Sequence, residues 1–122
     1  MAESPNSKKY DLEDRTLLFA RRVRNFIKNI KKTLTNIDDS KQLIRSSGSV
    51  GANYIEANES LSKKDFVLRV KICRKEAKEN RYWLRLIETA DANQETEREN
   101  LINEVTELMR IFGSMVEKTK VV

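Results

Sequence analysis

Basic side chains spaced along two predicted helices are the residues of this sequence best suited to bind a ligand. On a helical projection they fall within about 100° of arc on the first helix and about 120° on the third. Such rows of positive charge suit the phosphate backbone of a nucleic acid. Because no groove-reading or aromatic-interleaved motif accompanies them, we expect RNA or DNA to be bound through its backbone. The candidate nucleic-acid-binding residues are Arg21, Arg24, Lys28, Lys31 and Lys32 in one row, and Lys71, Arg74, Lys75, Lys78, Arg81 and Arg85 in the other.

The distribution of charge along the chain leaves a second interpretation open. The formal net charge is +5, divided as −1 in residues 1–7, +6 in 8–34, −2 in 35–61, +4 in 62–91 and −2 in 92–122. The basic rows can therefore also be read as solvated faces that meet the acidic helices of neighbouring subunits. On that interpretation the protein is a structural adaptor that binds another protein and no nucleic acid. An acidic membrane surface is a third interpretation of the same rows.

The residue types disfavour catalysis. Histidine is absent, which removes the most frequent general base and the commonest metal ligand. The single cysteine, Cys73, excludes an internal disulfide and a multi-cysteine zinc site. Glu56 and Glu59, like Glu76 and Glu79, have the spacing of a di-metal bundle, but such bundles use Glu-x-x-His. We predict a protein that is not an enzyme and that holds no metal and no cofactor.

The elements that carry these residues are expected to be long amphipathic helices, because the 122 residues include only three Gly and one Pro. Apolar spacing places them at about 11–34, 38–59, 63–90 and 96–118. The predicted fold class is all-α, an antiparallel up-down-up-down four-helix bundle at residues 10–118, with a flexible tail at 1–9 and a frayed end at 119–122. With no secretory signal and no apolar run of about 20 residues, we expect a soluble cytoplasmic protein.

Each helix is expected to turn one apolar row inward, and Ser62 with Asp65 forms a capping box at the start of the third helix. The inward residues predicted outside the third helix are Leu12, Phe19, Val23, Phe26, Ile30 and Leu34, then Leu43, Ile44, Val50 and Ile55, then Leu101, Val105, Leu108, Phe112 and Met115.

The third helix has more apolar surface than one bundle uses. Its main row is Phe66, Val70, Cys73, Ala77, Leu84 and Ile87, and a second row is Leu68, Ile72, Trp83, Leu86 and Ala90. Together they span an arc of about 200°, against a little over 100° for an ordinary surface helix. Either this helix is central and unusually buried, or the second row packs against a neighbouring subunit. The second interpretation predicts a closed cyclic homo-oligomer, with Leu68, Ile72, Trp83 and Leu86 in its interface.

Polar residues within this apolar arc need partners. Glu76, Glu79 and Asn80 fall inside it, and a buried carboxylate is costly unless it is hydrogen-bonded. We predict a structural polar network in which Asn53 and Glu56 of the second helix are their partners, and which fixes the register of the two helices.

Three motifs resemble one known family. They are RSSGSVGANYIEA at 45–57, LSKKDF at 61–66 and KEAKENRYWLRL at 75–86, and the first is the most specific. Its small residues favour close approach of the second helix to a neighbour. The sequence resembles the bacterial four-helix bundle protein family, which includes proteins encoded by intervening sequences in large-subunit ribosomal RNA genes and accessory proteins of diversity-generating retroelements.

The resemblance implies a homopentameric ring with a basic surface and offers no catalytic residues to carry over. Retroelement members of the family bind nucleic acid and a reverse transcriptase. Combined with the basic rows, this predicts a non-enzymatic nucleic-acid-binding oligomer, accessory to a reverse transcriptase or to an RNA-processing partner. The adaptor ring remains the alternative.

Overall fold

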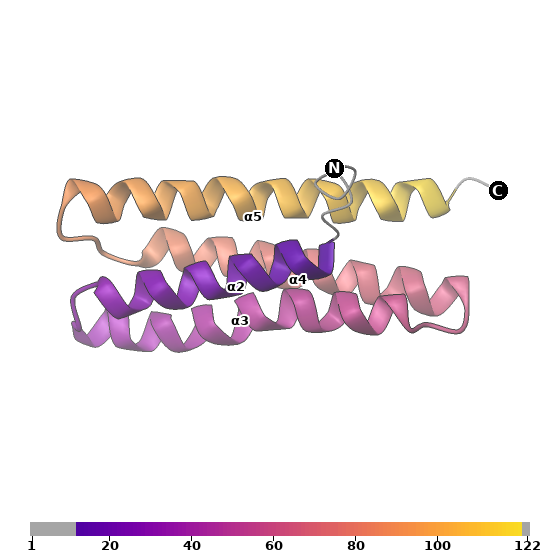
Figure 1. The fold of residues 1–122 in the computed structure, drawn as a ribbon, viewed down its shortest axis with the longest axis horizontal. Helices are drawn as coiled ribbons and strands as arrows, with labels where there is room; N and C mark the ends of the chain where they lie inside the picture. The colour runs from indigo at the N-terminus through magenta and orange to yellow at the C-terminus, as the bar shows by residue number, and fades with distance from the viewer. Residues whose placement is uncertain (1–11, 121–122) are drawn as a thin grey trace, which may run out of the picture.

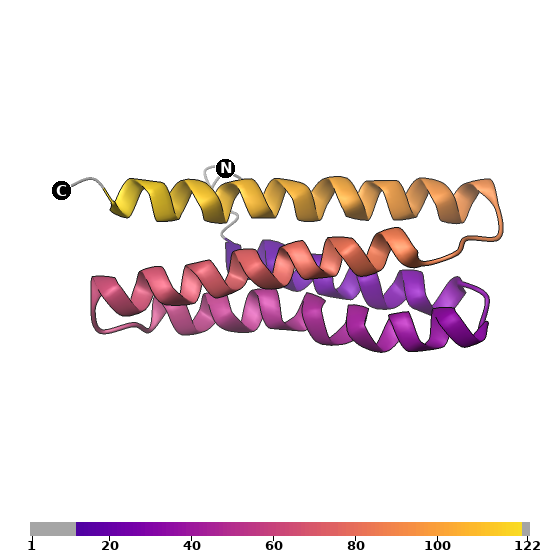
Figure 2. The ribbon, with the colours of Figure 1, turned by 180° about the vertical axis from the view of Figure 1, so that it is seen from behind.

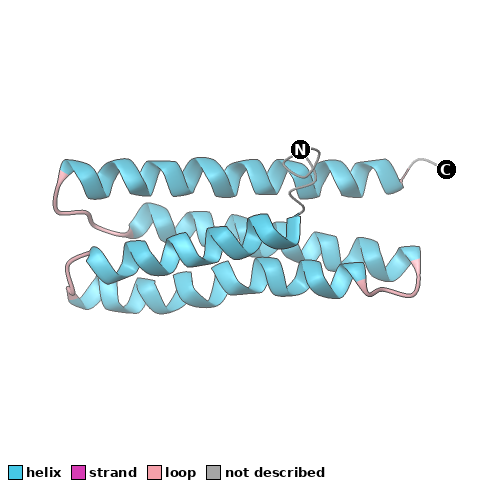
Figure 3. Cartoon of the chain, in the orientation of Figure 1, coloured by secondary structure: helices cyan, strands magenta, loops and turns pink. Residues whose placement is uncertain are grey.

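The computed structural model describes residues 12–120, which form four α-helices and no strand (Figure 3). The helices are α2 (Leu12–Asn29), α3 (Leu34–Asn58), α4 (Lys63–Leu86) and α5 (Ala92–Thr119). The all-α prediction is confirmed for this part of the chain. The tail predicted at residues 1–9 and the last two residues of the predicted frayed end lie outside the described residues.

Successive helices run in opposite directions along one long axis (Figure 1). The connections 30–33 and 87–91 lie at one end of the molecule, and the connection 59–62 lies at the other. Helix α4 packs between α3 and α5, while α2 packs on α3 and, less extensively, on α5. The view from behind shows α4 alongside α3 and below α5 (Figure 2). The up-down-up-down order places α2 and α4 on diagonally opposite corners of the bundle.

All four helices contribute to one core, which the apolar spacing predicts well. Its largest fully buried apolar side chains are Phe19, Leu43, Leu84, Leu101, Leu108 and Phe112. The prediction that two residues of α3, Ile44 and Ile55, point inward is wrong. Ile44 and Ile55 are 39% and 49% exposed, because the small side chains of Ser46 and Ser47 occupy the buried side of the helix instead.

Three side chains cap helix N-termini and set where the helices begin. Thr33, Ser62 and Asp91 each accept a hydrogen bond from the backbone N–H three residues further on. The cap predicted at Ser62 is therefore confirmed. Because Thr33 starts a new helix, α2 ends at Asn29, and the prediction that it continues to Leu34 is wrong. Leu34 is the first residue of α3 and is 80% exposed.

The ends of α2 and α4 are joined through one buried amide. Asn36 donates to the carbonyls of Lys31 and Glu88, each at 3.0 Å, and accepts from the backbone N–H of Glu88 at 3.0 Å. These bonds tie the two connections together. Helix α4 therefore ends at Leu86, short of the predicted Ala90, and α5 begins at Ala92, before the predicted Thr96.

Candidate nucleic-acid interface

The basic row of α4 lies along the seam between α4 and α5. Lys71, Arg74, Lys75 and Lys78 line a hollow of about 430 Å³ whose apolar wall is Met109 of α5. Two side chains fix the row against α5. Arg81 Nη1 donates to Thr106 Oγ1 at 3.2 Å, and Arg74 Nη1 lies 3.5 Å from the point where a Cβ on Gly113 would sit.

Most of this row is exposed to solvent. Lys71, Arg74, Lys75, Lys78 and Arg85 are exposed, and Arg81 is half-buried. Among the described residues, the only carboxylate within 4 Å of a cation of this row is Glu76, whose Oε2 lies 3.8 Å from Lys75 Nζ. The positive charge of the row is thus almost uncompensated within the subunit.

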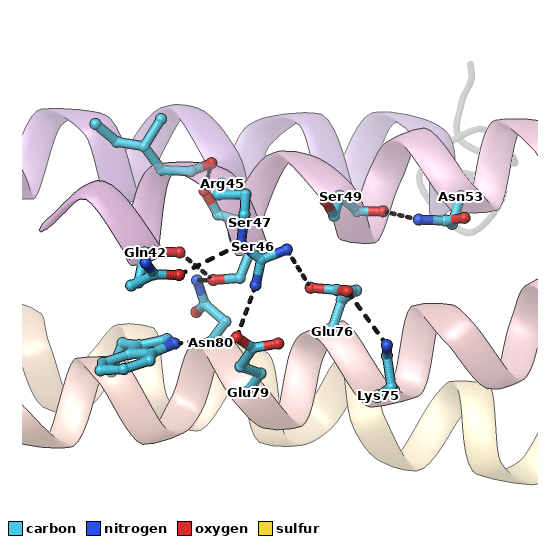
Figure 4. Close-up of polar contacts among 12 residues, drawn as sticks. Gln42, Arg45, Ser46, Ser47, Ser49, Asn53, Lys75, Glu76, Glu79 and Asn80 are labelled. Atoms are coloured by element: carbon cyan, nitrogen blue, oxygen red, sulfur yellow. Dashed lines mark hydrogen bonds and ion pairs between the residues drawn. The ribbon is translucent and has the colours of Figure 1, made fainter. Parts of the chain in front are cut away.

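The carboxylates of α4 are held on its opposite side by an arginine of α3. Arg45 donates to Glu76 Oε1 at 3.1 Å and to Glu79 Oε2 at 2.7 Å, and its side chain points between the two carboxylates (Figure 4). Burial disfavours the charged guanidinium, yet its bonds to Glu79 and Glu76 outweigh that effect and raise the pKa of Arg45. Arg45 therefore partly neutralises the carboxylates of Glu76 and Glu79 on the α3 side of α4, so that they compensate less of the positive charge of the basic row.

The carboxylates of α5 show a similar division. Glu104 accepts two hydrogen bonds from Arg15, the shorter 2.7 Å long, and Glu97 lies 3.6 Å from Arg22. Both pairs lie between α5 and α2. Two carboxylates of α5, Glu97 and Glu104, are thus directed to its α2 side and away from the basic row of α4.

The basic row of α2 lies on a different face. Arg21 and Arg24 line a groove of about 440 Å³ between α2 and α3, together with Leu17, Gly48 and Ile55. Because α2 and α4 are diagonal, the structure does not bring the two predicted rows together within one subunit.

The last part of the α2 row is not helical. Lys28 is exposed near the end of α2, whereas Lys31 and Lys32 lie in the connection that follows it. Their predicted placement on the helix is wrong, because α2 ends at Asn29.

The polar network between α3 and α4 has different members from those predicted. Asn80 is fully buried and donates to Ser46 Oγ at 2.9 Å and to the carbonyl of Leu43 at 3.3 Å, while its Oδ1 has no partner in the described chain. The predicted partners lie further along α3. Asn53 accepts from Arg69 at 3.2 Å and donates to the carbonyl of Ser49, and Glu56 is exposed.

Sequence reasoning missed Arg45 as the partner of Glu76 and Glu79. One signal pointed to it, since Arg45 is the only basic residue between Lys41 and Lys63. An isolated cation on a predicted helix, opposite two carboxylates of the next helix, is a natural counter-ion. The prediction that Asn53 and Glu56 fill this role is wrong.

The residues predicted for a subunit interface lie on the outer side of α4 next to α3. Leu68 and Leu86 are 56% and 44% exposed, and Ile72 and Trp83 are half-buried. Trp83 donates to Glu79 at 3.4 Å and packs edge-on against Tyr82, with ring centroids 5.1 Å apart. Ala90, the last residue predicted for this row, is in the connection after α4. The side of α4 next to α3 therefore exposes the apolar side chains of Leu68 and Leu86.

The remaining chemically reactive or metal-binding groups form no site. Cys73 is buried in the core, and burial raises the pKa of its thiol to about 12, so it is a poor nucleophile. Within residues 12–120, no three metal-binding side chains come together, and no helix is long and apolar enough to cross a membrane.

These features define an all-α bundle protein whose surface charge is segregated by face. The chain belongs to the family of 23S rRNA-intervening sequence proteins, whose model matches residues 8–114. The family resemblance seen in the motifs is thereby confirmed, and the family is not named for an enzymatic activity.

A solved structure supports the same assignment. It is described as a protein with unknown function from the S23 ribosomal protein family of Bacteroides thetaiotaomicron. The two chains are 34% identical, the match covers 85% of this chain and 96% of that one, and the TM-score is 0.71. No curated protein matches this chain.

Proposed function

We propose that this protein is a non-enzymatic, nucleic-acid-binding oligomer that contacts the backbone of its ligand through the basic rows of α2 and α4. The observation that carries the proposal is the α4 row, whose cations face solvent with one carboxylate within 4 Å. Uncompensated charge in a regular row is stabilised by a polyanion, which releases its counter-ions on binding. The name of the family, which refers to an rRNA-intervening sequence, favours RNA as the ligand.

The oligomer is part of the proposal. The exposed Leu68 and Leu86 beside half-buried Ile72 and Trp83 make an apolar surface that a closed ring would cover. A pentamer is the subunit number implied by the family resemblance. Repetition of the basic rows around a ring strengthens many weak phosphate contacts through effective concentration. A reverse transcriptase or an RNA-processing enzyme is the proposed protein partner.

The experiment is a mobility-shift titration with duplex RNA and duplex DNA of unrelated sequences. The wild type is expected to bind both at about 50 mM salt and to lose affinity steeply by about 200 mM, because the logarithm of affinity falls with the number of phosphates neutralised. Replacing Arg21, Arg24, Lys28 and Lys31 by Glu tests the α2 row, and replacing Lys71, Arg74, Lys75 and Lys78 by Glu tests the α4 row. Circular dichroism and light scattering check that each variant keeps its helices and its oligomeric state.

The structural adaptor is the second candidate, and the groove between α2 and α3 favours it. Its apolar wall includes Leu17 and Ile55, 51% and 49% exposed, beside Arg21 and Arg24. A surface that combines apolar and basic groups in this way suits a protein segment. If the wild type shifts neither RNA nor DNA at low salt, nucleic-acid binding is excluded and the adaptor becomes the better proposal.

A further inference from the structure

The α4–α5 seam has a basic residue of α5 that the two predicted rows do not include. Thr106 of α5 accepts a hydrogen bond from Arg81 of α4, and Arg74 of α4 lies 3.5 Å from the point where a Cβ on Gly113 would sit. Arg110 lies four residues after Thr106 and three before Gly113, which are the spacings that share a helix face. Arg110 is exposed, and these spacings place it at the outer edge of the same seam.

No carboxylate of the described chain pairs with Arg110, whereas the acidic residues of α5 are engaged elsewhere. Glu95 and Glu99 bond or lie close to Arg98, Glu104 pairs with Arg15 across the bundle, and Glu117 lies 3.3 Å from Lys120. Glu107 is three residues before Arg110 on α5, a spacing at which the two could pair, but no ion pair joins them in the described chain. Arg110 thus adds positive charge to the seam without a matching acid.

The cations of the seam extend along a length that suits several phosphates of one strand. Lys71 and Arg85 are 14 residues apart on α4, or about 21 Å at 1.5 Å per residue. A strand of a duplex presents one phosphate for about every 3.4 Å of helix axis, so about six phosphates span the same distance. Four cations of the α4 row and Met109 of α5 line the hollow in this track. The spacing of Arg110 from Thr106 and Gly113 places it beside the track on α5.

We infer that Arg110 is a phosphate-binding residue and that the α4–α5 seam binds one strand of a nucleic-acid duplex along its backbone, with α4 and α5 on either side of the strand. This inference rests on the proposed function and refines it, because it names the face that binds and adds a residue from a helix of net negative charge. The planar guanidinium of Arg110 has the geometry to donate two hydrogen bonds to one phosphate.

The test compares Arg110→Ala with Lys118→Ala. Both residues are exposed cations of α5, so the two variants change the net charge and the same helix equally. Lys118 lies 14 residues, about four turns, beyond Glu104 and so falls toward the α2 side. The titration uses a 20-base-pair RNA duplex of arbitrary sequence at several salt concentrations between about 50 and 200 mM.

Arg110→Ala is expected to bind more weakly than wild type at low salt and to reduce the slope of log affinity against log salt by about 0.9 for each contact removed. The ratio of the wild-type affinity to the Arg110→Ala affinity is then expected to fall about 3.5-fold per contact as salt rises from 50 to 200 mM. Lys118→Ala is expected to keep the wild-type slope. Equal slopes for Arg110→Ala and Lys118→Ala, with a wild type that binds, overturn this inference and leave the rows of α2 and α4, without Arg110, as the candidate binding residues. A wild type that binds no duplex overturns the proposed function and this inference together.

Discussion

Two glycines of α3, Gly48 and Gly51, differ in how much room a side chain would have. A Cβ on Gly51 would lie 2.8 Å from Thr16 Oγ1 and 3.2 Å from Thr16 Cβ, inside normal contact distance. Thr16 cannot easily move, because it is buried and its hydroxyl donates to the carbonyl of Leu12 at 2.7 Å. A Cβ on Gly48 would meet only the end of Arg24, at 3.9 Å. Gly51 is thus required for the approach of α2 to α3, and Gly48 is not.

Gly51→Ala is therefore expected to lower the free energy of unfolding. Overpacking of this kind costs about 1–3 kcal/mol, and the better helix propensity of Ala returns only about 0.5–1 kcal/mol. The matched control, Gly48→Ala, has no clash and is expected to stabilise the protein by up to about 1 kcal/mol. Urea denaturation of both variants measures the difference. If both substitutions stabilise the protein equally, the close approach of α2 to α3 at Gly51 is wrong.

Residue types predicted the core of this protein better than its polar contacts. Phe19, Val105 and Phe112 are buried as their spacing indicates, since apolar periodicity reports directly which face of a helix turns inward. The partner of Glu76 was not predictable in the same way. Asn53 and Arg45 are both on α3, and only the relative register of α3 and α4 decides which of them reaches the carboxylate. The candidate binding residues on α4 could be found from charge alone, whereas Arg110 required knowing which side of α5 faces α4.

At the scale of the helices, the sequence predicted that four helices exist, but it did not predict where α2 and α4 end. The four helices follow from the apolar spacing, but α2 ends five residues and α4 four residues before the predicted ends. The cap at Thr33 is one cause, and a long-range bond is another. Asn36 bonds to both connections and so selects where the chain leaves helical geometry, and no local propensity records a bond between residues 36 and 88. The shorter α2 moves Lys31 and Lys32 off the helix and limits its basic row to Arg21, Arg24 and Lys28.

The start of α5 is clamped to the end of α4 by Arg98. Its guanidinium donates to the carbonyls of Leu84 and Arg85, each at 3.3 Å, and is held in place by Glu95 at 2.7 Å. The bond from Arg98, with a second from Thr89, lowers the pKa of Glu95 from its ordinary 4.5 to about 2. The ionised form of Glu95 is therefore favoured in the folded state.

This shift predicts a defined pH dependence. Because the folded pKa is depressed, the contribution of Glu95 to stability is fully present above pH 4.5 and is lost as the pH falls toward about 2. The difference in unfolding free energy between wild type and Glu95→Gln is expected to be constant above pH 4.5 and to shrink below it. Denaturant titrations at pH values from 2.5 to 7 measure this difference. Parallel stability curves for the two proteins across that range would contradict the role given to Glu95.

At the scale of the whole molecule, the sides of the bundle differ in their chemistry. The α4–α5 seam is basic, and the α2–α5 side contains the ion pairs Arg15–Glu104 and Arg22–Glu97. The outer side of α4 next to α3 exposes the apolar Leu68 and Leu86 along with the pair Arg45–Glu79. A bundle with one core does not need the exposed Leu68 and Leu86. The proposed interface between copies of the chain would account for the width of the apolar arc on α4 and for the separation of the basic rows, since a ring would bring different faces of adjacent subunits together.

The assembly can be tested without disturbing the core. Trp83→Glu is expected to weaken the oligomer, but Trp83 also packs against the core, so a change there affects folding as well. Leu68→Glu and Leu86→Glu are cleaner variants, because these side chains are 56% and 44% exposed. Each is expected to reduce the mass measured by light scattering at micromolar concentration, because a buried interfacial carboxylate without a partner is costly. The matched control is Leu18→Glu on α2, which is 47% exposed on another helix and is expected to keep the wild-type mass. A wild type that is monomeric at this concentration, or a loss of mass in Leu18→Glu but not in Leu68→Glu, would show that the apolar side of α4 is not the interface.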